Sequence, residues 1–445
     1  MSVEKRPLGV VSATTIVAAS MIGVGVYTTS GYTLAALETP ERVIAAWMVG
    51  GLIAICGAIG YASLASRFAE SGGEYLFLSR TLHPLAGLMA GWVSLLAGFT
   101  GAIAAAALGM EEYLSPLMIE PLQGLPGNTF AILAVLLAAA LHSIRVRSSA
   151  RTQDVVVVLK LFMIAGFILF AMRTVGSWNV TSAEDSESLP PAALSLMAFA
   201  NQLVYISFSY AGFNAAVYVA GEVTDAKRNV PRAMIAGTVL VTVIYVILNA
   251  IFVFAAPFST ITSGANIGQV AATAAQSIGG DRFTLFVRIV IVVSLFTSVS
   301  ALVMTGPRVY AKMADDGLFP SWFRFEDRPP LQAIWFQAAL AIVVISVATL
   351  KDLLGYLGLT LSVCSALTVS MLLVMRMRGN PIRLPLFGIP SLIYIVATLG
   401  LALLYGIGNP WQAAATGITI AIGFVLYPWV AKRLVLPDQP QSDDA

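Results

Sequence analysis

The chain has 445 residues, of which 58% are hydrophobic and 11% are charged, and its mean hydropathy is +0.85. Soluble domains carry about 25% charged residues, so this composition excludes an ordinary soluble domain and indicates an integral membrane protein with several spans. A net charge of +2 is too small to indicate nucleic-acid binding, and two cysteines in apolar spans, Cys56 and Cys364, give no disulfide framework or thiolate metal cluster.

A helical crossing needs about 20 apolar residues, and this length predicts twelve spans. The segment before the first span lacks the pattern of a cleavable secretory signal, so we expect that span to be retained. The predicted spans are 8–36, 43–66, 85–110, 128–144, 152–174, 193–221, 233–257, 284–312, 332–349, 352–375, 387–406 and 411–431.

Lysines and arginines indicate how the spans are oriented, because they collect in cytoplasmic loops. The N-terminal segment 1–7, the loops after even-numbered spans and the C-terminal tail 432–445 hold 19 of the 25 basic residues. The sequence therefore predicts a multi-pass protein of the cell (inner or plasma) membrane with both termini in the cytoplasm.

Small residues near the middle of the first and sixth spans indicate interrupted helices. Gly23 and Gly25 lie in the first span, and Ala211, Gly212 and Asn214 lie in the sixth. Close packing of membrane helices is the alternative interpretation. Interruptions at matching positions in two halves are typical of inverted-repeat transporters. The predicted repeats are 8–175, with spans one to five, and 193–376, with spans six to ten, followed by spans eleven and twelve in 387–431.

Two interrupted helices would free backbone groups where no bulk water can satisfy them. Free N–H groups at the start of a half-helix favour a carboxylate, and free carbonyls at the end of another favour an ammonium. An α-amino acid carries both groups. The carboxylate is expected at Ile22, Gly23, Val24 and Gly25, and the amine at carbonyls of Ser20 or Met21, Phe208 and Ala211; Ser209, Tyr210, Gly212 and Asn214 complete the predicted site.

Side chains near the sixth-span interruption bear on the substrate class. They include Phe208, Tyr210 and Asn214 but no Asp or Glu, so a neutral amino acid is favoured over a cationic amino acid or an amine. Phe208 or Tyr210 is a candidate for an aromatic lid over the substrate, with ordinary helix packing as the alternative.

Lys160 is an ionisable residue inside the predicted fifth span, in "VVVVLKLFMIAGFILF". Such residues are costly in a membrane and are usually functional, although a lysine near a helix end also reaches the headgroups. Two functional interpretations stay open: a fixed cation that replaces a metal ion between the first and fifth spans, or a lysine that binds and releases a proton.

Glu222 ends the sixth span close to Arg228 in "YVAGEVTDAKRNVPRAM". A solvated or salt-bridged helix end is one interpretation, and a cytoplasmic gate formed by these charges is the other. No pattern in the sequence indicates a cofactor or a metal site.

Several stretches together resemble the amino acid, polyamine and organocation (APC) superfamily. They are "MIGVGVYTTSG", "ESGGEYLFLSRTLHPLAGLMAGW", "FSYAGFNAAVYVAGEVTDAKRNVPRAM", "GPRVYAKMADDGLFP" and "MRMRGNPIRLPLFGIP", in the order of the family and over nearly the whole chain. Within the superfamily, the sixth-span motif, "RNVPRA" and a fifth-span lysine look most like the L-type amino-acid transporters and their bacterial relatives.

This resemblance implies an all-α LeuT-like fold with two inverted five-helix repeats, two extra helices, and unwound first and sixth spans at mid-membrane. It implies a carboxylate loop at Gly23, Val24 and Gly25 and an aromatic gate at Phe208. It also places Lys160 at the position of a sodium site in related carriers, which favours sodium-independent transport.

Three features differ from relatives. Val24 stands where many members have Ser or Ala, so a hydroxyl contact to the carboxylate is absent. Asn214 stands where arginine-exchanging relatives carry a glutamate, in agreement with a neutral substrate. Residues 111–127 hold no cysteine, whereas animal L-type carriers use one there to link a glycoprotein, so no disulfide-linked accessory subunit is expected.

The sequence thus predicts a sodium-independent carrier of neutral L-amino acids that exchanges one for another by alternating access. Proton-coupled symport through Lys160 and transport of cationic amino acids or amines are the alternatives. An intramembrane enzyme is disfavoured because the spans supply no catalytic His, Asp or Ser/His constellation, and a channel is the remaining rival.

Overall fold

The computed structural model describes residues 8–143, 150–174, 195–324, 331–379 and 385–431. The termini and several basic residues used to predict the orientation, such as Arg145 and Arg147, lie outside the described residues. The described part is helical, with a single parallel bridge between Leu8 and Val223 in place of a sheet.

Helices form because each apolar stretch must satisfy its backbone groups within itself. The first half contains α1 (Val10–Met21), α2 (Val24–Leu37), α3 (Pro40–Arg67), α4 (Gly73–Thr81), α5 (Pro84–Val93), the π-helix η1 (Ser94–Gly101), α6 (Ala102–Leu114), η2 (Ser115–Leu117), α7 (Glu120–Gln123), α8 (Thr129–Ser143) and α9 (Ala150–Arg173).

The second half continues in the same way. It contains α10 (Leu196–Ser209), η5 (Ala215–Glu222), α11 (Ala226–Phe254), α12 (Phe258–Thr262), η6 (Gly264–Gly268), α13 (Val270–Asp315), η7 (Ser321–Phe323), α14 (Leu331–Val347), α15 (Leu350–Met377), η8 (Pro385–Gly388), α16 (Ile389–Gly408) and α17 (Pro410–Ala431).

The described residues of each predicted span fall on one of these helices or on a consecutive set of them. Within the described residues, seven helices are long and apolar enough to cross a membrane, or eight if α1 and α2 form one bent span; α8, α10 and α14 are apolar but shorter. The structure therefore agrees with a multi-pass membrane protein, whereas the twelve crossings and the inverted repeat stay predictions.

Both predicted interruptions are breaks in the helices. The axes of α1 and α2 differ by 42° across Ile22 and Gly23. The helix α10 ends at Ser209, and the chain passes through turns before it enters the 3₁₀ helix η5 at Ala215.

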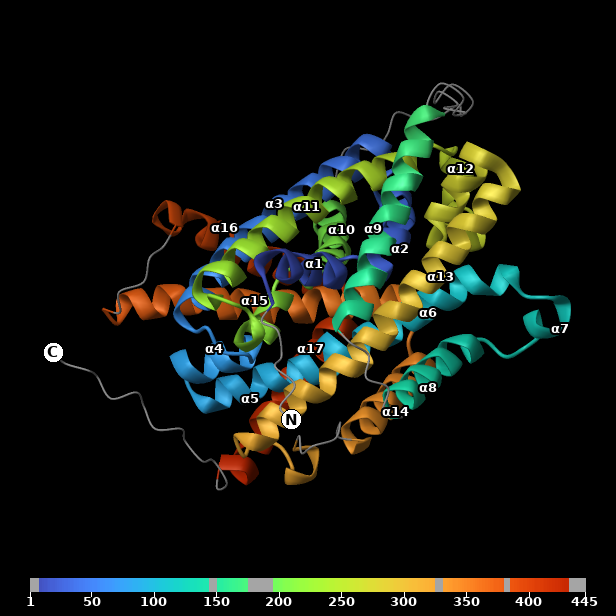
Figure 1. The fold of residues 1–445 in the computed structure, drawn as a ribbon. Helices are drawn as coiled ribbons and strands as arrows, with labels where there is room; N and C mark the ends of the chain where they lie inside the picture. The colour runs from blue at the N-terminus through green and yellow to red at the C-terminus, as the bar shows by residue number, and fades with distance from the viewer. Residues whose placement is uncertain (1–7, 144–149, 175–194, 325–330, 380–384, 432–445) are drawn as a thin grey trace.

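Glycines allow the helices around these breaks to pack closely, as membrane helices often do. The helices α3 and α11 run side by side (Figure 1). A Cβ at Gly51 of α3 would lie 2.9 Å from the Tyr210 hydroxyl, and one at Gly50 would lie 3.4 Å from the Tyr210 ring. The α3 backbone therefore lies directly against the residues that follow α10.

Candidate functional site

A cavity of about 550 Å³ lies between the two breaks. Every residue of the predicted substrate site except Ile22 lines it, and Lys160 and Glu222 line it as well. The volume falls in the range of small-molecule sites, about 300–1,000 Å³. The structure thus brings together two segments that are almost 190 residues apart in the sequence, at positions 20–25 and 207–215.

The cavity opens to the protein surface at some of its lining residues. Its lining includes Glu222 and Arg308, which are exposed. Thr29 and Ser30 of α2, a few residues after Gly25, are fully buried and do not line the cavity. The Trp47 indole donates a hydrogen bond to Ser30 Oγ (2.8 Å), which donates to Asn249 Oδ1 (2.5 Å), so polar side chains from α3, α2 and α11 pair with one another beyond the first break.

The first break leaves backbone donors at the cavity. Gly23 is the N-cap of α2 with extended backbone angles, φ −124° and ψ −157°. The first N–H groups of a helix have no carbonyl one turn earlier to bond to, and here they belong to Val24 and Gly25, which line the cavity. Ile22 is buried, and its N–H bonds the Ala18 carbonyl at 3.1 Å.

Close approach of the two breaks requires glycine at two positions. A Cβ at Gly25 would lie 2.8 Å from Ser209 Cα, and a Cβ at Gly212 would lie 2.8 Å from the Ser20 carbonyl carbon. Gly212 also has a φ of +100°, which side chains disfavour. The predicted interruption glycines therefore place the two broken helices in direct contact.

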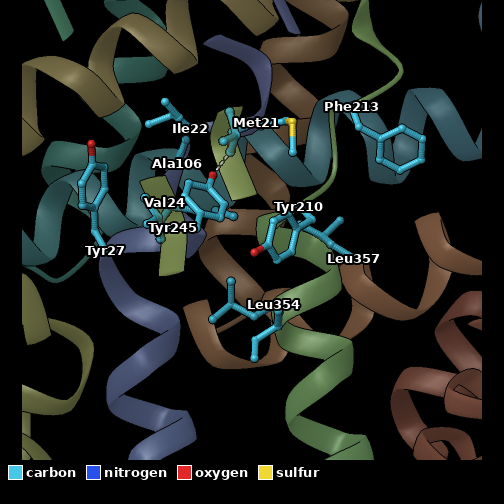
Figure 2. Close-up of a cluster of buried hydrophobic side chains, with 14 of the residues drawn as sticks. Met21, Ile22, Val24, Tyr27, Ala106, Tyr210, Phe213, Tyr245, Leu354 and Leu357 are labelled. Atoms are coloured by element: carbon cyan, nitrogen blue, oxygen red, sulfur yellow. Dashed lines mark hydrogen bonds between the residues drawn. The ribbon is translucent and has the colours of Figure 1, made fainter. Parts of the chain in front are cut away.

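Tyr245 of α11 joins the ends of α1 and α10. Its hydroxyl lies 2.5 Å from the Met21 carbonyl oxygen and 3.1 Å from the Ser209 carbonyl oxygen. Figure 2 shows the Tyr245 ring between the Val24 and Tyr210 side chains, with the bond to Met21 dashed. The last carbonyls of a helix have no partners within their own helix, and the single O–H of Tyr245 is shared between two of them, with the shorter contact to Met21.

The aromatic candidates differ in their surroundings. The Tyr210 ring is 1% exposed, and its hydroxyl donates to the Trp47 carbonyl at 3.0 Å. Phe208 is half-buried at the cavity, and its carbonyl accepts the Ala211 N–H at 2.9 Å. Of the two, Phe208 keeps a partly exposed ring, and its role as a lid stays a prediction.

Lys160 of α9 lies against the first break. Its ammonium donates a hydrogen bond to the Ile22 carbonyl, and the residue is 5% exposed. The side chain is therefore directed at the break and into the protein and not toward the protein surface. This position agrees with a fixed cation between the first and fifth spans, and the function of Lys160 stays a proposal.

Glu74 of α4 is a residue of the cavity that the sequence interpretation missed. It is 5% exposed and accepts hydrogen bonds from the hydroxyls of Tyr61 (2.9 Å) and Tyr218 (2.5 Å) and from the Asn214 amide. The residues next to the sixth-span interruption in the sequence include no carboxylate, as expected. The expectation is nevertheless wrong for the folded protein, because α4 brings Glu74 to Asn214 from 140 residues away.

Two glycines explain how Glu74 reaches this position. Gly72 and Gly73 have φ values of +153° and +58°, and a Cβ at Gly73 would lie 2.9 Å from the Tyr218 ring. Residues other than glycine rarely adopt these backbone angles. The run "ESGGEYLFL" was therefore the available signal: an acidic residue directly after two glycines at the start of an apolar helix.

The predicted gate residues do not meet. Arg228 lies 3.9 Å from Asp225, and both are exposed. Among the described residues Glu222 has no ion pair with Arg228; instead its backbone carbonyl accepts the Leu8 N–H at 2.8 Å. Thr224 N–H in turn donates to the Leu8 carbonyl at 2.9 Å. Backbone bonds therefore join the segment before α1 to the end of η5.

Comparison with known proteins agrees with this arrangement. The model of the family described as amino acid permease matches residues 8–430. The serine/threonine exchanger SteT of Bacillus subtilis is 28% identical over 353 residues, 77% of each chain.

Longer matches involve mammalian proteins. The large neutral amino acids transporter small subunit 2 of Homo sapiens is 26% identical, over 92% of this chain and 81% of its own. The b(0,+)-type amino acid transporter 1 of Mus musculus is 26% identical, over 95% of this chain and 87% of its own. The chain therefore belongs to the amino acid permease family of the APC superfamily, a family of membrane transporters and not of enzymes.

Proposed function

We propose that this protein is a sodium-independent exchanger of neutral L-amino acids that works by alternating access. The observation that carries the proposal is the cavity between two broken helices, with orphan N–H groups of α2 on one side and the end of α10 on the other. The relatives named above as an exchanger and as transporters of amino acids support it.

The substrate would lie with its carboxylate at the N–H groups from Gly23 to Gly25 and its ammonium at carbonyls of Ser20, Met21 and Phe208. Positive potential at the start of α2 favours the carboxylate. Val24 contributes only its backbone donor, because its side chain forms no hydrogen bonds.

The position of Lys160 supports the proposal of sodium independence. A sodium ion at the first break would be coordinated by carbonyl oxygens that the helix interruption frees. The Lys160 ammonium already donates to the Ile22 carbonyl and supplies a fixed positive charge there. We therefore expect transport to proceed at full rate without sodium.

Alternating access would move spans one, two, six and seven relative to the remaining helices. With both termini in the cytoplasm, as the basic residues predict, the open side of the cavity at Glu222 and Arg308 faces the cytoplasm. The loops between spans three and four lack cysteine, and Cys56 and Cys364 lie in α3 and α15, so we propose that no disulfide-linked subunit is needed.

Proton-coupled uptake is a second candidate, because Lys160 is a buried, titratable group at the first break. Liposomes that contain the purified protein distinguish the two functions. Exchange predicts that uptake of labelled threonine requires an unlabelled amino acid inside and is unchanged when potassium replaces sodium. Uptake into empty vesicles under an inward proton gradient would instead establish symport, and dependence on sodium would contradict the role proposed for Lys160.

A further inference from the structure

The carboxylate of Glu74 is held by neutral donors from three parts of the chain. Tyr61 belongs to α3, Asn214 follows the sixth-span break, and Tyr218 belongs to η5. Among the described residues no lysine or arginine pairs with Glu74. Burying a charge is costly unless hydrogen bonds compensate, and these three bonds keep an acceptor group at the cavity wall.

Glu74 also fixes the orientation of the Asn214 amide. An ionised carboxylate only accepts hydrogen bonds, so the amide must direct its NH₂ group at Glu74 and its Oδ1 elsewhere. Asn214 is half-buried and lines the cavity, and among the described residues Oδ1 accepts no hydrogen bond. The amide therefore has an unused acceptor at the cavity, and one of its two N–H donors is occupied by Glu74.

A second unused acceptor position belongs to Glu74 itself. Of the four acceptor positions of a carboxylate, two on Oε1 are filled by Tyr61 and Asn214, and one on Oε2 is filled by Tyr218. Glu74 lines the same cavity. Both groups beside the sixth-span break can thus accept a hydrogen bond from a donor that enters the cavity.

We propose that Glu74, through Asn214, selects amino acids whose side chains end in a hydrogen-bond donor. The proposal rests on the function proposed above: it narrows the neutral substrates to those with a side-chain donor and extends the substrates to side chains with an ammonium group. A hydroxyl, an amide or an ammonium group supplies the donor, an aliphatic side chain leaves the acceptors unpaired, and an acidic side chain adds a second negative charge. Glu74 is a specificity residue beside the sixth-span break, in the wall of the cavity that the first break also lines.

Competition in exchange assays measures this preference. Threonine and valine have nearly the same shape, but threonine has a hydroxyl where valine has a methyl group. Because unpaired polar groups penalise the wrong substrate, we expect threonine to inhibit uptake at concentrations at least about tenfold lower than valine in the wild-type protein. Glutamate should not inhibit. Diaminobutyrate, which carries a side-chain ammonium, should inhibit at lower concentrations than valine.

Glu74→Gln provides the decisive variant. A glutamine both donates and accepts, so Asn214 is free to turn its NH₂ group into the cavity. We expect the threonine preference to fall to within about threefold, valine exchange to continue, and glutamate to become an inhibitor. Glu70→Gln is the matched control, because it removes the same charge from a carboxylate whose side chain is 63% exposed; its preferences should equal those of the wild type.

Three results would overturn the inference. The first is equal inhibition by threonine and valine in the wild type, and the second is an unchanged threonine preference in Glu74→Gln. The third is an equal loss of affinity for threonine and valine in Glu74→Gln, which indicates a purely structural role. If Glu74→Gln does not fold, Asn214→Ala must show the loss of preference instead. If the wild type exchanges no amino acid at all, the proposed function fails before this inference is tested.

Discussion

The two broken helices are stabilised by side chains of opposite charge from distant elements. At the first break a cation, Lys160 of α9, donates to a backbone carbonyl. At the sixth break an anion, Glu74 of α4, accepts from the side chains of Asn214 and Tyr218. The comparison shows two ways to compensate for an interrupted helix inside a membrane protein, where each unsatisfied polar group costs several kcal/mol.

The difference follows from the length of each break. Only Ile22 and Gly23 separate α1 from α2, and two side-chain donors serve this short break, Lys160 at the Ile22 carbonyl and Tyr245 at the Met21 carbonyl. The sixth break runs from Tyr210 to Asn214 and continues into a 3₁₀ helix, which has weaker backbone hydrogen bonds than an α-helix. That half of the span therefore depends on side-chain bonds to α4 and α3.

The largest effect is expected where the two breaks touch. Gly25→Ala should abolish amino-acid binding and exchange, because its Cβ would lie 2.8 Å from Ser209 Cα and would force the breaks apart. The measurement is exchange in liposomes together with the thermal shift caused by amino acids.

Gly166→Ala is the control for this change. Gly166 lies in α9, and a Cβ there meets no atom within 4 Å, so exchange should equal that of the wild type. Retained amino-acid affinity in Gly25→Ala would remove the first break from the substrate site.

Loss of the cation at the first break should have the next largest effect. Lys160→Ala leaves the Ile22 carbonyl without this donor, at a cost of about 1–3 kcal/mol, and we expect exchange to fall at least about tenfold. Initial rates measured from pH 6 to pH 8 also test proton coupling. Wild-type rates and wild-type pH dependence in Lys160→Ala would show that the cation at the first break has no role in transport.

Tyr245 connects the two breaks directly, and removing its hydroxyl should have a moderate effect. Tyr245→Phe loses the donor to the Met21 and Ser209 carbonyls, which contributes about 1 kcal/mol. We expect a several-fold lower exchange rate with a small decrease in melting temperature. A variant that melts earlier but exchanges normally would limit Tyr245 to stability.

The smallest effect is expected at the base of α4, which carries Glu74. Tyr75 is 4% exposed and donates to Asp316 at 2.6 Å. Tyr75→Phe should destabilise the protein by about 1 kcal/mol and weaken substrate affinity slightly.

The contribution of Tyr75 should not change between pH 7 and pH 9. Burial, with the bond to Asp316, raises the pKa of Tyr75 above its usual value. The pKa of a tyrosine in the unfolded state is near 10. Because the pKa of Tyr75 is higher than this in the folded protein, its contribution to stability is fully present below about pH 10 and is lost only as the pH rises further. Melting curves of wild type and Tyr75→Phe across this range check the prediction, and a difference that shrinks by pH 9 would contradict it.

The helices and their breaks were predictable because the signals are local. Apolar runs of about 20 residues must be helical in a membrane, and Gly23, Gly25 and Gly212 lie where the chain interrupts its helices. The π-helix at Ser94–Gly101 was not predicted, because no distinct residue pattern marks it. The positive φ of Gly280 within α13 was not predicted either, although the pair Gly279-Gly280 is a turn signal.

The site was predictable only in part. Lys160 stood out because a lone charge in an apolar run is unusual. Glu74 did not, because it stands between predicted spans, where an acidic residue is ordinary. The partners of Glu74 and Tyr245 are up to 224 residues away in the sequence, and only the packing of α3, α4 and α11 brings them together.

The most direct test of the account is an experimental structure with a bound amino acid. Cryo-electron microscopy of the protein with saturating threonine should show the ligand between the two breaks, with its carboxylate at the N–H groups of residues 23–25, Lys160 still bonded to the Ile22 carbonyl, and its hydroxyl toward Asn214. Threonine bound elsewhere in the cavity, or a ligand carboxylate paired with Lys160 in place of the backbone, would contradict the account.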